Sequence, residues 1–109
     1  MRDRYGWTAL MWSTQNSDWE MTRVLVSRGA NTKFRDKDGD TPLMNAVLHP
    51  QYDRADLRIV RLLLANGADP LTLNRKGFSP LSVAHRPPVQ ESLVRVLLKR
   101  RQLKSTARP

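Results

Sequence analysis

The chain has 109 residues, 39% of them hydrophobic and 27% charged, with a formal net charge of +9 and no cysteine. This composition is typical of one soluble globular domain with a modest core, and it excludes disulfides and thiolate metal sites. No apolar run approaches the roughly 18 residues of a membrane span, and no long apolar segment at the N-terminus indicates a secretory signal, so we expect a cytoplasmic protein.

Three short segments along the chain share the same turn and helix-capping chemistry. They read YGWTALMWS at 5–13, DGDTPLMNA at 38–46 and KGFSPLSVA at 76–84. In each segment a glycine can adopt positive φ, and the Thr or Ser two residues later can accept a hydrogen bond from a free amide of a helix. Pro42 and Pro80 then suit the first helical position, where the missing N–H costs nothing. The pattern predicts three short helices.

A leucine-rich segment follows each of these turns. The three segments are MTRVLV at 21–26, IVRLLL at 59–64 and LVRVLL at 93–98. The first two are followed by Gly29 and Gly67, which stand where a helix C-terminus favours a left-handed residue. Each copy is therefore a turn, a short helix, a loop and a longer helix. No copy can bury its apolar face alone, so the three copies must stack.

These residues resemble the ankyrin repeat, whose signature is Gly-x-Thr-Pro-Leu-His-x-Ala ahead of a Leu-rich helix and Gly-Ala-Asp. The resemblance implies an all-α solenoid of three stacked helix-turn-helix repeats joined by β-turn-like loops. We expect a single domain over 1–103, with repeats at about 3–35, 36–73 and 74–103 and a basic tail at 104–109. In the first repeat Ser13, Thr14 and Thr22 replace apolar residues, and we expect an exposed outer edge there.

The sequence contains few candidates for catalysis or metal binding. Its two histidines, His49 and His85, each precede a proline near the end of a short helix and are expected to be loop-edge residues. Asp36, Asp38 and Asp40 suggest a calcium loop, but the later glutamate of such a loop is missing and turn formation accounts for them. No phosphate-binding glycine-rich loop is present. We therefore expect no enzyme activity, metal, cofactor or small-molecule substrate.

A protein partner is the function that the resemblance implies, because the turn tips and the first helices of ankyrin-like proteins line a concave binding surface. The variable positions of that surface carry aromatic and charged residues, a composition typical of binding hot spots for an acidic partner. The expected contacts are Arg4, Tyr5, Trp7, Trp12, Lys37, Asp40, Asn45, Arg75, Lys76 and Phe78. Alternatively, Trp7 and Trp12 pack on each other at the edge of the first repeat. Trp19, at the start of a second helix, is expected to pack in the core.

The basic C-terminus indicates a second possible function. More than half of the net charge lies in the last eleven residues, which hold five cations and no acid. Lys99, Arg100, Arg101 and Lys104 are candidate contacts for electrostatic nucleic-acid binding, although such a run is often only a solvated helix end. The extra residues at 49–57 are interpreted as a tolerated insertion between two helices, with a functional loop as the alternative.

Overall fold

The computed structural model describes residues 8–48, 56–84 and 94–99, and these residues form helices and turns. The helices are α1 (Ala9–Gln15), α2 (Trp19–Ser27), α3 (Pro42–Leu48), α4 (Leu57–Ala65) and α5 (Pro80–Ala84), and residues 94–99 are also helical. None of these helices is long and apolar enough to cross a membrane.

The first helix of each repeat begins at the residue that the turn signature indicates. The side-chain oxygens of Thr8, Thr41 and Ser79 accept hydrogen bonds from backbone N–H groups three residues ahead, at 3.3, 3.3 and 3.1 Å. Pro42 and Pro80 are the first residues of α3 and α5. These bonds satisfy amides that have no partner inside the helix, which is why the helices start at these residues. The predicted caps are confirmed.

The second helices are capped by aspartates and end at glycines. Asp18 accepts a hydrogen bond from the Met21 N–H at 3.1 Å, and Asp56 accepts one from the Arg58 N–H at 2.9 Å. Gly29 and Gly67 have φ values of 87° and 99°, the left-handed region expected after a helix C-terminus. The predicted helix ends are confirmed, whereas the two aspartate caps escaped the sequence analysis.

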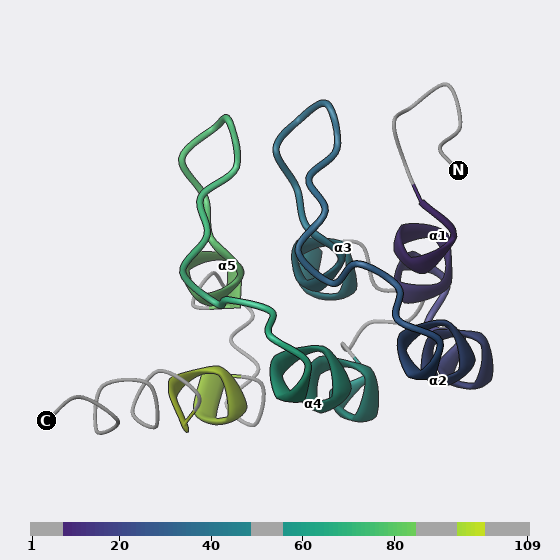
Figure 1. Ribbon diagram of the computed structural model, residues 1–109. Helices are drawn as coiled ribbons and strands as arrows, with labels where there is room; N and C mark the ends of the chain where they lie inside the picture. The colour runs from purple at the N-terminus through teal and green to yellow at the C-terminus, as the bar shows by residue number, and fades with distance from the viewer. Residues whose placement is uncertain (1–7, 49–55, 85–93, 100–109) are drawn as a thin grey trace, which may run out of the picture.

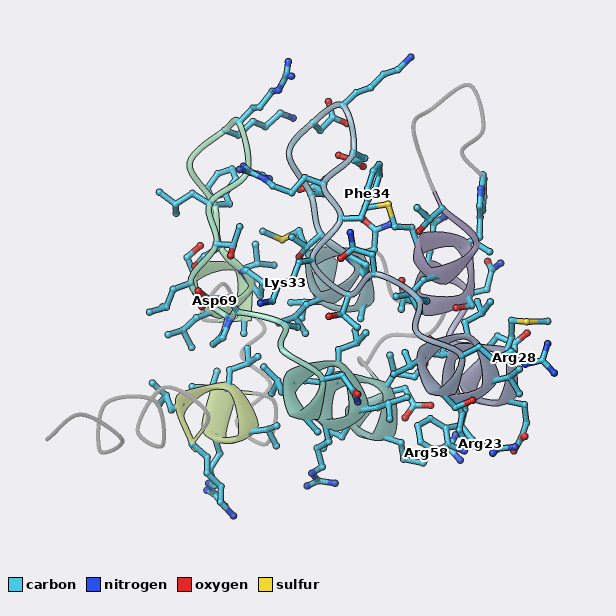
Figure 2. All side chains as sticks on the ribbon, in the orientation of Figure 1. Arg23, Arg28, Lys33, Phe34, Arg58 and Asp69 are labelled. Atoms are coloured by element: carbon cyan, nitrogen blue, oxygen red, sulfur yellow. The ribbon has the colours of Figure 1, made fainter. Side chains whose placement is uncertain are left out.

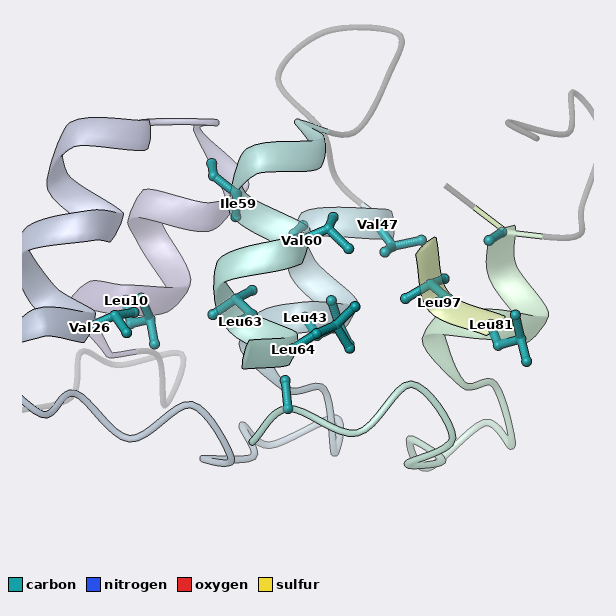
Figure 3. Packing of buried hydrophobic residues seen from close by; sticks show 13 residues of the cluster. Leu10, Val26, Leu43, Val47, Ile59, Val60, Leu63, Leu64, Leu81 and Leu97 are labelled. Atoms are coloured by element: carbon teal, nitrogen blue, oxygen red, sulfur yellow. The ribbon is translucent and has the colours of Figure 1, made fainter. Parts of the chain in front are cut away.

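The helices form two rows (Figure 1). One row contains α1, α3 and α5, and the other contains α2, α4 and the helix at 94–99, while the loops between repeats project on the side of the first row. Contacts between α1 and α3, α3 and α5, and α2 and α4 join successive repeats. The interior between the rows is mainly apolar and includes Leu10, Leu43, Ile59, Leu63, Leu81 and Leu97 (Figure 3). The all-helical stack predicted from the repeats is confirmed.

The polar residues of the first repeat lie inside the stack, so the expectation of an exposed edge there is wrong. Ser13, Thr14 and Thr22 are all buried. Ser13 and Thr14 donate hydrogen bonds to the carbonyls of Leu10 and Met11, at 3.0 and 2.9 Å, and Thr22 donates to the Ser13 hydroxyl at 2.9 Å. Because each hydroxyl finds a partner on its own or the adjacent helix, burial leaves none of these donors unsatisfied.

Candidate functional site

The two loops at 32–41 and 70–79, together with the exposed side of α1, form a surface that we name the loop face. The loops are joined by hydrogen bonds between repeats. The Arg75 N–H donates to the Asp38 carbonyl at 2.9 Å, and the Asn74 amide donates to the Asp40 carboxylate at 2.9 Å. Arg35 Nη2 also donates to the Leu73 carbonyl at 2.6 Å. The loops therefore hold each other in place, which favours a preformed surface.

Five of the residues expected to bind a partner are exposed on this face. Trp12 and Phe78 each keep 38% of their surface accessible. Lys37, Arg75 and Lys76 are exposed on the turns at the tips of the loops, which Figure 1 shows extending away from the helices. The other aromatic and basic candidates, Arg4, Tyr5 and Trp7, lie outside the described residues. The loop face thus combines apolar and basic side chains.

Two predicted binding residues, Asp40 and Asn45, are buried, so the expectation that their side chains are exposed was wrong. Asp40 is 7% exposed because Asn74 of the next loop reaches over to donate to its carboxylate. Asn45 is fully buried inside α3, and neither its amide nitrogen nor its oxygen has a hydrogen-bond partner in the part of the chain that the structure describes. Neither side chain is placed to contact a partner. The equivalent of Asn45 in the first repeat, Trp12, is exposed, so register within the repeat alone does not determine exposure.

The loop face also exposes two leucines that the sequence analysis missed. Leu71 and Leu73 are 43% and 56% exposed. Of the five large hydrophobic residues exposed in the described ranges, these two, Trp12 and Phe78 lie on the loop face, and only Met21 lies on a second helix. The available signal was the alternation PLTLN at 70–74, which places apolar residues in a segment with no helix to bury them.

A hollow of about 270 Å³ lies between the segments at 32–35 and 67–72, where successive repeats meet. Figure 2 shows Lys33 and Asp69 in this region. The lining is polar and includes cations and hydroxyls: Thr32, Lys33, Arg35, Thr41, Gly67, Asp69 and Thr72. Arg35 is held there by its bonds to the carbonyls of Gly39 and Leu73. With Arg35 held in place, Lys33 beside it and Asp69 as the acid in the lining, the hollow has a net excess of cations that suits a carboxylate.

Asp36, Asp38 and Asp40 do come together, with one carboxylate oxygen of each within 4.8 Å of the others. The Asp36 carboxylate accepts the backbone N–H groups of Asp38 and Asp40, both at 2.9 Å. Gly39 completes the turn with a φ of 78°. An aspartate that bonds amides two and four residues ahead is a turn-forming device, so turn formation explains this cluster.

On the opposite side of the stack, Arg58 links α4 to α2. Its guanidinium lies 2.9 Å from the Asp56 carboxylate and 5.1 Å from the centre of the Trp19 ring. Hydrogen bonds from this guanidinium lower the pKa of Asp56, and the same bonds raise the pKa of Arg58. Trp19 packs against the core with part of its surface, as expected. Arg58 therefore serves as a structural bridge between two repeats.

Of the candidate nucleic-acid contacts, Lys99 is exposed at the end of the helix over 94–99. The other three, Arg100, Arg101 and Lys104, lie outside the described residues, as do both histidines. Of the expected insertion at 49–57, residues 49–55 also lie outside them, whereas Asp56 caps α4 and Leu57 begins it.

Capped helix pairs, glycine-terminated second helices and projecting loops define a helical repeat protein. The family model for ankyrin repeats (3 copies) matches residues 1–74, and the chain belongs to the ankyrin repeat family. It is 42% identical over 83 residues to "Ankyrin repeat, SAM and basic leucine zipper domain-containing protein 1" of Mustela putorius furo and of Neofelis nebulosa, and 40% identical to that of Ovis aries. Each match covers 76% of this chain and 17% of the relative. Ankyrin repeats are generally protein–protein interaction modules and not enzymes.

Proposed function

We propose that the chain binds a partner protein through the loop face, and that the partner presents an acidic surface there. The observation that carries the proposal is the distribution of exposed apolar side chains. Four of the five large hydrophobic residues exposed in the described ranges lie on the loop face, beside exposed cations. Aromatic side chains and arginine are enriched at protein interfaces, and the rim around them is polar.

The arrangement assigns different tasks to the apolar and the charged residues. Trp12 and Phe78 supply large rigid contact areas, and Leu71 and Leu73 extend the apolar surface along the third loop. Lys37, Arg75 and Lys76 at the tips attract carboxylates, which increases the rate of association with an acidic partner. The hollow beside Lys33 can accept one acidic side chain.

Affinity capture from native lysate tests this function. Bound proteins are identified by mass spectrometry for the wild type and for the double variant Trp12→Ala/Phe78→Ala. Loss of two anchors of about 2 kcal/mol or more each should weaken the binding of a loop-face partner by roughly a thousandfold and remove that partner from the captured set. The matched control is Met21→Ala, because Met21 is an exposed apolar residue on α2 and away from the loop face.

The proposal fails if the double variant retains the captured proteins at wild-type levels, or if Met21→Ala loses them equally. Far-ultraviolet circular dichroism of each variant verifies that the helices are intact. Repeating the capture at raised salt tests the acidic character of the partner, since attraction between exposed charges weakens as ionic strength increases.

A further inference from the structure

The second helices carry an arginine at the same position in all three repeats. The third residue of each leucine-rich segment is an arginine: Arg23, Arg61 and Arg95. All three side chains are exposed. We name Arg23, Arg61 and Arg95 the arginine row. Since the helices that bear them stack side by side, the repeat itself produces a line of cations across the molecule.

The arginine row lies on the side of the stack away from the loop face. Figure 2 shows Arg23 on α2 at the side opposite the projecting loops, and nitrogen-tipped side chains extend on that same side from α4 and from the helix at 94–99. Arg28 and Lys99 are also exposed in this layer. The two surfaces are therefore separate, and occupation of one does not block the other.

The row has little internal compensation. A carboxylate three or four residues before or after an arginine on the same helix can pair with it. The residues after the three arginines are not acidic: Val26, Ser27, Leu64, Ala65, Leu98 and Lys99. Of the residues before them, Glu20 precedes Arg23 and Glu91, outside the described residues, precedes Arg95, whereas Arg61 has no acid on either side. Arg23 pairs with Glu20 at 2.7 Å, but both side chains are more than half exposed, and such surface pairs contribute little. No ion pair holds Arg61 or Arg95 within the described residues. The row is thus available to an external anion.

The spacing of the row favours a helical ligand. Packed helices lie about 8–10 Å apart, which sets the interval between successive arginines along the stack. An α-helix rises about 1.5 Å per residue, so glutamates seven residues apart recur about every 10.5 Å along one face. Each guanidinium can then form a two-pronged hydrogen bond with a carboxylate. We infer that the arginine row is a second docking surface, and that its occupant is an acidic α-helix with carboxylates at seven-residue intervals lying across the second helices.

A designed peptide tests this surface without knowledge of the natural ligand. The probe is a fluorescently labelled helical peptide with glutamates at every seventh residue, and its control has the same composition with the glutamates scattered around the helix. Binding to the full chain is measured by anisotropy at low and moderate salt. We expect the spaced peptide to bind at least about fivefold more tightly than the scattered one.

Two matched triple variants separate the arginine row from general charge. Arg23→Gln/Arg61→Gln/Arg95→Gln and Lys37→Gln/Arg75→Gln/Lys76→Gln each remove three exposed cations, the second from the loop tips. The first variant should bind the spaced peptide at least about tenfold more weakly than the wild type, and the second variant less than about twofold more weakly. The variant Arg23→Lys/Arg61→Lys/Arg95→Lys keeps the charge but loses the fork, and should show an intermediate loss.

Three results would overturn the inference. One is equal weakening by the two neutral triple variants, and another is equal affinity for the spaced and scattered peptides. The third is tighter binding of a DNA or RNA duplex than of the spaced peptide, lost in the arginine variant and steeply dependent on salt, which would make the occupant a nucleic-acid backbone. Failure of the loop-face variants to change protein capture leaves this inference intact, because the two tests use different residues.

Discussion

The first and second repeats begin with the same turn chemistry but fill their interiors differently. Where the first repeat has Ser13 and Thr22, the second has Ala46 and Val60 at the same positions of the repeat. All four residues are buried. The comparison shows that the stack accepts polar and apolar interiors alike, provided that each buried hydroxyl has a hydrogen-bond partner nearby.

The repeats also differ in their place in the stack. The second repeat has neighbours on both sides, since α3 contacts both α1 and α5. Its Leu63 is fully buried, whereas Leu25, the matching residue of the first repeat, is only partly buried. The same leucine should therefore contribute unequally to stability in the two repeats.

Truncating this leucine in each repeat should give the largest effect. We expect Leu63→Ala to reduce the free energy of unfolding by about 3 kcal/mol or more, because a cavity opens in a site closed on all sides. Leu25→Ala should cost about half as much, since solvent already reaches that side chain. Urea denaturation followed by circular dichroism measures both. Equal losses would show that the two repeats are equally well enclosed.

The polar interior of the first repeat provides a more specific test, with a smaller expected change in stability. Ser13→Ala removes the acceptor of the Thr22 hydroxyl, which is fully buried, and should destabilise the chain by about 1–2 kcal/mol. The double variant Ser13→Ala/Thr22→Val reproduces the Ala46 and Val60 of the second repeat and leaves no hydroxyl unpaired. Its stability should return to within about 0.5 kcal/mol of wild type. A double variant as unstable as the single one would contradict this explanation.

The helix caps could be predicted from the sequence, and the stacking of the helix pairs could be predicted from the repetition of the sequence pattern. Thr8, Thr41 and Ser79 cap helices because capping depends on residues three positions away. Repetition of the same helix pair implies stacking because no pair can bury its own apolar face.

Exposure at the variable positions could not be predicted in the same way. Asp40 is covered because Asn74, 34 residues later and in the next repeat, donates a hydrogen bond to its carboxylate. Leu71 and Leu73 are exposed because the loop that carries them has no helix against which to pack them. Such outcomes depend on the neighbouring repeat, and a signature that describes one repeat at a time does not contain them.

Asn45 provides the last test of the comparison between the interiors of the two repeats, and the one with the smallest expected change in stability. Its amide is fully buried, and unlike the hydroxyls of the first repeat, neither of its polar atoms has a hydrogen-bond partner among the described residues. Replacing it with a leucine, which branches at the same carbon but is larger, removes that desolvation penalty at some cost in packing, so the net increase in the free energy of unfolding for Asn45→Leu should be about 1 kcal/mol. Ser13→Leu would not be a comparable change, because the Ser13 hydroxyl already has hydrogen-bond partners and the serine side chain is much smaller than leucine. Thermal and urea denaturation measure the change, and Asn45→Ala serves as the control that removes the amide but leaves a cavity. If Asn45→Leu destabilises the chain while preserving its helicity, the amide is satisfied in solution, and the interior of the second repeat follows the same rule as that of the first.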